Sequence, residues 1–195
     1  MRVMTNDHDN GLARINVVNF DEATVDEMRR SVNHCLEHEQ PAMMIDICTE
    51  GGYVYELLAM IDLVEAAKAK GVTIVTYASG KALSSGAVLL ASGTPGHRYA
   101  GHHATVMVHE VHGGASGEPT RATGGVRELT RLNKRLIGLL GEYSGKGYQH
   151  FVELIQSKDG PDVYLDAPKA KRNGLVDHIG TPFHLARTDI SHVVV

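Results

Sequence analysis

Ser84 occupies the junction between two apolar segments, and its surroundings suit a nucleophile. A β-branched run, Val72–Ala78, precedes it, and an apolar run suited to a buried helix, Ala87–Ser92, follows it. A serine at such a junction lies at a helix N-terminus, where unpaired backbone N–H groups and a positive dipole stabilise an alkoxide or oxyanion. The letters A-x-S-x-G at 82–86 also approximate the G-x-S-x-G nucleophile elbow. Ser84 is therefore a candidate nucleophile, although a serine that only caps the helix has the same local signature.

A nucleophilic serine needs a base within hydrogen-bond reach and a group that orients this base. His109, at the end of the apolar run Thr105–Val108, and a carboxylate further along the chain are candidates for these roles. The chain has 12 histidines, so the residue type alone does not single out His109. Its position adds to the case, because Gly52, Ser84 and His109 each come just after a predicted strand. Sites in parallel sheets gather beyond the carboxyl ends of strands, so we expect the three at one edge.

A zinc site is an alternative use of the same histidines. His109, Glu110 and His112 form the pattern H-E-x-H, with His102 and His103 nearby. This spacing differs from H-E-x-x-H, which places both histidines on one face of a helix. Surface or strand-edge histidines are therefore favoured over a metal site.

The elements that position these residues alternate between strand and helix. Apolar runs predict strands at 13–20, 43–48, 72–78 and 105–108. Helical periodicity predicts one helix that begins at a capping box formed by Thr24 and Glu27. It predicts four further helices, at 53–70, 87–92, 126–143 and 148–155. Asp166 is a predicted N-cap of one more short helix, which Gly174 ends. Strand and helix joined by short connections indicate βαβ crossovers, so the predicted class is α/β.

Size and charge limit the classes of function. A chain of 195 residues is long enough for a single domain with its own core. Its net charge of -4, from 19 basic and 23 acidic residues, argues against nucleic acid or an anionic membrane as the main partner. Two cysteines, Cys35 and Cys48, are read as small buried thiols, and no apolar stretch approaches a membrane span. We therefore expect a cytoplasmic protein.

Five motifs occur in an order that resembles the proteolytic subunit of the Clp proteases, from about Ala13 to about Ile179. They read TEGG at 49–52, GKALSSGA at 80–87, MVH at 107–109, DVYLDAPKA at 162–170 and GLVD at 174–177. Each motif alone is weak, whereas five in one order are specific. The resemblance implies a serine endopeptidase that hydrolyses polypeptides.

The resemblance assigns a role to each matching site residue. It makes Ser84 the nucleophile, His109 the general base and then acid, and Asp162 the carboxylate that orients the imidazole. The backbone N–H groups of Gly52 and Ser85 would form the oxyanion hole. No cofactor or metal is implied.

The resemblance also implies a crotonase-like ββα spiral with a C-terminal helical handle. The chain would be one domain over 1–195, with a head at 13–112 and 159–180 and a handle at 113–158. The handle would contain a Gly-rich strand, Gly113–Gly117, and the long helix Val126–Tyr143. In relatives, heptameric rings pair through these handles and enclose a chamber, so a homo-oligomer is expected.

Three departures bear on partners. Only 12 residues precede Ala13, whereas relatives have a longer N-terminal segment that helps dock a hexameric AAA+ unfoldase, so an ATPase partner is left open. Glu50 stands where the family has proline, and Ser85 replaces an apolar residue. Compact chains of this kind resemble the Clp-like proteases of tailed phages.

Rival interpretations remain. An inactive relative would keep the ring as an assembly scaffold, and a crotonase-like acyl-CoA enzyme would use similar backbone N–H groups without this serine. Within a peptidase, Lys81 suggests a Ser-Lys dyad, although a solvated lysine is a poor base, and Ser85 is a second candidate nucleophile.

Overall fold

A computed structural model of the chain describes residues 12–114, 116–157 and 161–182. The segment before Ala13, on which the expectation about an ATPase partner depends, lies almost wholly outside the described residues. Among the described residues, no helix combines the length and the apolar character that crossing a bilayer requires.

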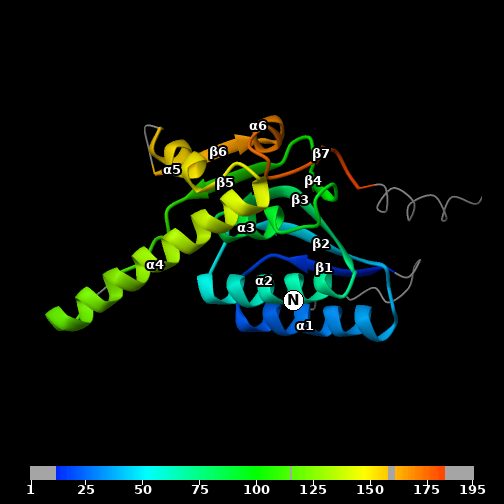
Figure 1. Cartoon of the computed structure of the whole chain (residues 1–195), viewed down its shortest axis with the longest axis horizontal. Coiled ribbons are helices and arrows are strands. Elements are labelled where there is room, and N and C mark those ends of the chain that lie inside the picture. The colour runs from blue at the N-terminus through cyan, green and yellow to red at the C-terminus, as the bar shows by residue number, and fades with distance from the viewer. Residues whose placement is uncertain (1–11, 115, 158–160, 183–195) are drawn as a thin grey trace, which may run out of the picture.

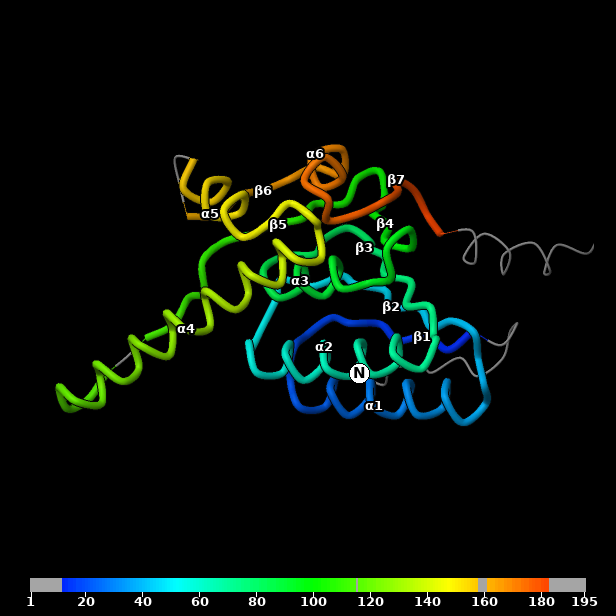
Figure 2. The backbone as a smooth tube through the Cα atoms, in the orientation of Figure 1, coloured from blue at the N-terminus to red at the C-terminus, as the bar shows by residue number. Residues whose placement is uncertain are grey.

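Seven strands form one sheet in which all but one of the pairings are parallel. The strands are β1 (Ala13–Val17), β2 (Ala42–Thr49), β3 (Thr73–Leu83), β4 (Arg98–Ala100), β5 (Thr105–His109), β6 (Asp162–Asp166) and β7 (His178–Ile179). The order β1-β2-β3-β4-β7 forms the main path, and β3 also pairs with β5. The exception is β6, which pairs with β5 antiparallel and lies beside it in Figure 2 although about 50 residues separate them in the chain.

Among the described residues, six helices accompany this sheet. They are α1 (Glu22–Glu37), α2 (Val54–Ala69), α3 (Ser85–Ala91), α4 (Pro119–Ser144), α5 (Tyr148–Gln156) and α6 (Ala167–Arg172). α1 and α2 pack against each other beside β1 and β2, whereas α4 extends well away from the body of the molecule (Figure 1). Helices around a mainly parallel sheet confirm the predicted α/β class and agree with the crotonase-like fold that the resemblance implies.

The apolar periodicity of the sequence corresponds to the observed core. The buried set includes Val17 of β1, Ile45 of β2, Ile74 of β3 and Leu89 of α3, all with no exposed surface. Of the two cysteines, Cys35 is buried as predicted, but Cys48 is exposed because it lies at an outward position near the end of β2.

The N-cap of α1 differs from the prediction. Asp21, not Thr24, caps the helix, and its side chain accepts a hydrogen bond from the Thr24 backbone N–H at 2.9 Å. The predicted capping box was wrong because an aspartate three residues earlier satisfies the same backbone group. At α6, the predicted cap is confirmed, since Asp166 accepts a hydrogen bond from the Lys169 N–H.

The third strand does not end at Ala78, where the sequence predicts its end. β3 continues to Leu83, and the register with β2 moves from Ile47 opposite Ala78 to Thr49 opposite Ala82. Gly80 has φ +88°, a conformation that side chains disfavour, so it bends the strand at a bulge. Beyond this bend, Lys81–Leu83 pair with β5. The glycine therefore turns the chain toward β5 and brings Ser84 with it.

The long helix and the Gly-rich segment before it also differ from the prediction. α4 begins at Pro119, seven residues before Val126, because a proline suits the first turn and Gly124 and Gly125 are tolerated inside the helix. The segment Gly113–Gly117 forms no strand in its described residues, which exclude residue 115. Glycines pack poorly in strands, and the prediction of a strand there was wrong for this chain.

Candidate active site

The pairing of β5 with β6 brings His109 and Asp162 together. These two residues are direct partners in the antiparallel register, His109 at the end of β5 and Asp162 at the start of β6. Residues directly opposite in such a pair have neighbouring side chains. The His109 Nδ1 atom lies 3.0 Å from Asp162 Oδ1. Fifty-three residues separate them in the chain, so the strand pairing alone creates this contact.

The bent end of β3 brings Ser84 to the other ring nitrogen of His109. Leu83 pairs with Met107 of β5, and the Ser84 backbone N–H donates to the Met107 carbonyl at 2.9 Å. The Ser84 Oγ atom then lies 2.7 Å from His109 Nε2. The three side chains form one continuous hydrogen-bonded series from hydroxyl to imidazole to carboxylate.

The backbone of Ser84 is strained, as a nucleophile elbow requires. Its φ of 56° and ψ of -118° are uncommon for a residue with a side chain. Ser84 is the N-cap residue of α3, but its side chain makes no capping hydrogen bond. The hydroxyl is aimed at His109 instead, which argues against the interpretation of Ser84 as a simple helix cap.

Two glycines allow the turn after β2 to approach Ser84. Gly51 has φ +109°, and a Cβ at this position would lie 2.8 Å from Ser84 Cβ. Gly52 has no unusual φ; a Cβ there would lie 2.8 Å from Phe20 Cβ. The positive φ therefore belongs to Gly51, whereas Gly52 is required by close packing on Phe20.

The side chain of Ser85 is held away from the imidazole of His109. It is 1% exposed, and its hydroxyl donates to the Gly52 carbonyl at 3.1 Å. This contact connects the two residues predicted for the oxyanion hole. As the first residue of α3, Ser85 has a backbone N–H without an intrahelical partner. The side chain of Ser85 is therefore not arranged as a nucleophile, in contrast to that of Ser84.

Lys81 is also turned away from the site. Its Nζ donates to Glu50 Oε1 at 2.8 Å, and both side chains are exposed. The hydrogen bond that Lys81 donates to Glu50 raises the pKa of Lys81, which keeps the amine protonated. A Ser-Lys dyad is therefore not supported, and the glutamate in the place of the family's proline has a partner in this chain.

His109 is in a setting that favours the neutral imidazole. Burial is the main cause that lowers its pKa, and the neighbouring His112 lowers it further. The hydrogen bond and charge of Asp162 act in the opposite direction but do not outweigh burial. A neutral imidazole with Nδ1–H directed at a carboxylate leaves Nε2 free to accept the serine proton.

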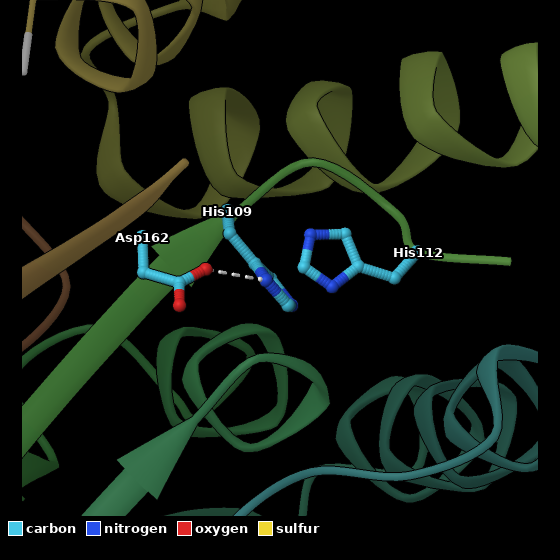
Figure 3. A group of neighbouring side chains, drawn as sticks. All are labelled: His109, His112 and Asp162. Carbon is cyan, nitrogen blue, oxygen red and sulfur yellow. Dashed lines mark hydrogen bonds and ion pairs between the residues drawn. The ribbon is translucent and has the colours of Figure 1, made fainter. Parts of the chain in front are cut away.

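His112 belongs to the same cluster, and the sequence did not predict this. Its ring lies edge-on to the His109 ring, with centroids 4.3 Å apart. Figure 3 shows His112 facing His109 on the side away from Asp162. We favoured surface or strand-edge histidines over a metal site, because the H-E-x-H spacing does not place both histidines on one face of a helix. The chain after β5 is not helical, and the two rings still meet; the pattern itself was the signal.

An apolar pocket adjoins these groups. Gly52, Ser84, His109 and His112 line one part of it. The remaining walls are aliphatic side chains from α2, α3, α4 and the end of β5, namely Val54, Val88, Val108, Val111, Leu136, Ile137 and Leu140. The contribution of α4 shows that the extended helix also shapes the site at its C-terminal half.

The comparison with protein families agrees with the resemblance read from the motifs. The family model described as Clp protease matches residues 10–182. This range includes every residue of the hydrogen-bonded series, the two glycines after β2 and the whole of α4.

Proposed function

The chain belongs to the Clp protease family, a family of peptidases, and we propose that it is a serine endopeptidase with Ser84 as nucleophile, His109 as general base and Asp162 as the orienting carboxylate. One observation carries the proposal. The contacts of 2.7 Å between Ser84 Oγ and His109 Nε2 and of 3.0 Å between His109 Nδ1 and Asp162 Oδ1 are those that a triad requires.

In the proposed reaction, Ser84 Oγ attacks the carbonyl carbon of the scissile peptide bond while its proton passes to His109 Nε2. The carboxylate of Asp162 accepts the Nδ1–H and stabilises the imidazolium that forms. His109 then gives its proton to the leaving amine, and an acyl-enzyme remains on Ser84. Water, deprotonated by His109, releases the acid product and restores the serine.

The oxyanion of the tetrahedral intermediate would be stabilised by the backbone N–H groups of Gly52 and Ser85. The hydrogen bond from the Ser85 hydroxyl to the Gly52 carbonyl supports this, because it keeps the turn at Gly52 close to the N-terminus of α3. Preorganised donors of this kind contribute about 3–4 kcal/mol to transition-state stabilisation. The N-terminus of α3 adds a favourable dipole.

The apolar pocket is proposed to hold the substrate side chain next to the scissile bond. Its aliphatic walls, such as Leu136 and Leu140, suit leucine or a residue of similar size. A fluorogenic peptide with leucine in this position is therefore the substrate for the first assay.

We extend the proposal to the assembly. Clp proteases form oligomeric rings that act on polypeptides, and a homo-oligomeric chamber, as one heptameric ring or two, is proposed for this chain in the cytoplasm. The head would comprise 13–112 and 159–180 and the handle 113–158, a division that the outward course of α4 supports (Figure 1). A Clp-type AAA+ unfoldase is an optional partner in this proposal.

Hydrolysis of a fluorogenic leucyl peptide by the purified oligomer tests the proposed function. We expect turnover by the wild-type protein and a loss of about 10⁴-fold or more in Ser84→Ala, with unchanged assembly. Ser85→Ala is the matched control and should lose much less activity, since it removes a contact with the Gly52 carbonyl but leaves both backbone N–H groups of the proposed oxyanion hole in place. Equal rates for Ser84→Ala and wild type would exclude Ser84 as nucleophile. Absence of turnover in a correctly assembled wild type would favour the inactive scaffold.

A further inference from the structure

His112 contacts the proposed general base but has no part in the proposed reaction. Its side chain is exposed, and its ring lies 4.3 Å from that of His109 at an interplanar angle of 65°. It follows β5 in a segment with no helix or strand, where it borders the apolar pocket. A second imidazole at this place adds a metal ligand beside an existing histidine and carboxylate.

The three side chains form a ligand set. Ligand atoms of His109, His112 and Asp162 all lie within 4.8 Å of one another (Figure 3). In a tetrahedral zinc site with bonds of about 2.0–2.1 Å, neighbouring ligand atoms lie about 3.4 Å apart. The His109 and Asp162 atoms lie somewhat closer than this, at 3.0 Å, so a small opening of their hydrogen bond would give the spacing. A modest movement of the exposed His112 side chain would complete a three-ligand site.

We propose that His109, His112 and Asp162 bind a zinc ion reversibly, and that the bound ion switches off the peptidase. Two imidazoles and one carboxylate are a common zinc ligand set, with a fourth position open to water. Imidazole ligands favour Zn²⁺ over Mg²⁺ or Ca²⁺, which prefer oxygen. The inhibitory half rests on the proposed function, whereas the binding of the ion does not.

Inhibition follows because both ring nitrogens of His109 are already in use. If Nδ1 binds the ion, its proton moves to Nε2, which then donates to Ser84 Oγ and cannot accept the serine proton. If Nε2 binds the ion, the hydrogen bond to Ser84 is lost directly. In either case Asp162 is drawn to the cation, and the imidazole no longer acts as a base.

In any titration, zinc binding at this site must be distinguished from zinc binding at another pair of histidines. His34 of α1 and His38, the C-cap residue of α1, lie with ring centroids 4.1 Å apart. Histidines four residues apart on a helix are a plausible surface site for zinc. His34→Gln is therefore included in every protein used for binding. His103→Leu, which removes an exposed imidazole from the turn before β5, is the matched control for His112→Leu.

Calorimetric titration with Zn²⁺ tests the binding half without any need for activity. The reference protein carries His34→Gln and Ser84→Ala. We expect a saturable site in this protein and in its His103→Leu variant, with an affinity weakened about tenfold or more by His112→Leu. The visible spectrum of bound Co²⁺ should show the same pattern. Indistinguishable titrations for all three proteins would overturn the site.

Peptide hydrolysis tests the inhibitory half. Zn²⁺ should inhibit the His34→Gln protein at micromolar concentration, and a chelator should restore the rate. The rate of each variant is divided by the rate of the same variant in the presence of chelator. The Zn²⁺ concentration that gives half inhibition should rise about tenfold or more in His112→Leu but not in His103→Leu. Equal sensitivity would overturn the proposal. A protein that binds Zn²⁺ through His112 but never hydrolyses peptides would confirm the site and refute both the inhibition and the peptidase function.

Discussion

At the scale of single residues, the hydrogen bonds of His109 account for the chemistry that we propose. Its two ring nitrogens face Ser84 and Asp162, and burial lowers its pKa. A base with this environment is neutral at neutral pH and needs no deprotonation before it acts.

The activity should therefore persist in mild acid. Because the pKa of His109 is lowered from 6.5, the acid limb of kcat/KM against pH should have its midpoint below 6.5. The lowered value means that the base stays neutral, and active, as the pH falls until this midpoint is crossed. The profile is measured with a chelator present. A midpoint above 6.5 would show that Asp162 dominates the electrostatics of His109.

A methyl group at Gly51 should damage the site more than the fold. Gly51→Ala would place Cβ 2.8 Å from Ser84 Cβ, in addition to the strain of its φ of +109°. Gly71→Ala is the matched control, because Gly71 has φ +86° but no atom within 4 Å of the added methyl group.

Gly71→Ala should lose about 1–2 kcal/mol in the free energy of unfolding and Gly51→Ala somewhat more because of its close contact with Ser84, but only Gly51→Ala should lose most of its kcat. Denaturant unfolding and peptide hydrolysis measure the two effects. Equal kcat values in the two variants would mean that close approach at Gly51 does not position the nucleophile.

Sequence alone identified some of these residues better than others. The strand-to-helix junction at Ser84 was visible from local pattern, whereas Asp162 came only from the family motif, because its contact depends on pairing between strands far apart in the chain. His112 was missed as a neighbour of His109, because a rule for helices was applied to a segment that is not helical.

At the scale of elements, an ion pair connects β4 to the chain just before β7. Arg98 Nη2 lies 2.6 Å from Asp177 Oδ1, and their side chains are 7% and 20% exposed. Asp177 also accepts hydrogen bonds from the backbone N–H groups of Gly96 and Arg98. The pair holds the last described strand onto the sheet.

Asp177→Asn should lower the free energy of unfolding by about 2–4 kcal/mol, because it leaves the Arg98 charge buried without its partner. Asp26→Asn, which removes an exposed ion pair with Arg29 on α1, should change it by no more than about 1 kcal/mol. Urea unfolding at pH 7 measures both. Similar losses in the two variants would show that Asp177 contributes no more than a surface charge.

The Asp177 pair also has an acid dependence. Burial alone would raise the pKa of this carboxyl, but the hydrogen bond and charge of Arg98 outweigh burial and lower it from 3.8. The stabilisation is therefore complete above 3.8 and is lost as the pH falls through the lowered pKa. Wild type and Asp177→Asn should converge in stability once the pH falls below the lowered pKa of Asp177.

Elements with strong periodicity were predictable, and those that depend on partners were not. α2 and β2 follow from apolar spacing within their own segments. β4 and β7 have three and two residues, too few for a pattern, and exist because β4 pairs with β3 and β7 pairs with β4. The continuation of β3 beyond Gly80 depends on β5, which only the folded chain supplies.

At the scale of the whole molecule, α4 extends beyond the body and presents an exposed apolar residue, Val126, which is 57% exposed. Tyr53 and Tyr55 at the start of α2 are also exposed, and Tyr55 donates a hydrogen bond to Glu128 of α4 at 2.6 Å. Exposed apolar groups on an extended helix are typical of contacts between subunits.

Val126→Glu should therefore weaken assembly, because it would place a charge in the proposed contact between handles. Ala23→Glu adds the same charge to an exposed position of α1 and is the control. Light scattering after size-exclusion chromatography should show a smaller or dissociating species for Val126→Glu only. An unchanged mass would place the subunit contacts elsewhere.

The most direct test of the central claim is labelling of the purified oligomer with a fluorophosphonate, located by intact mass and peptide mapping. The account predicts one adduct on Ser84, which is absent from Ser84→Ala and retained in Ser85→Ala. An assembled wild-type protein without an adduct, or an adduct that persists in Ser84→Ala, would contradict it.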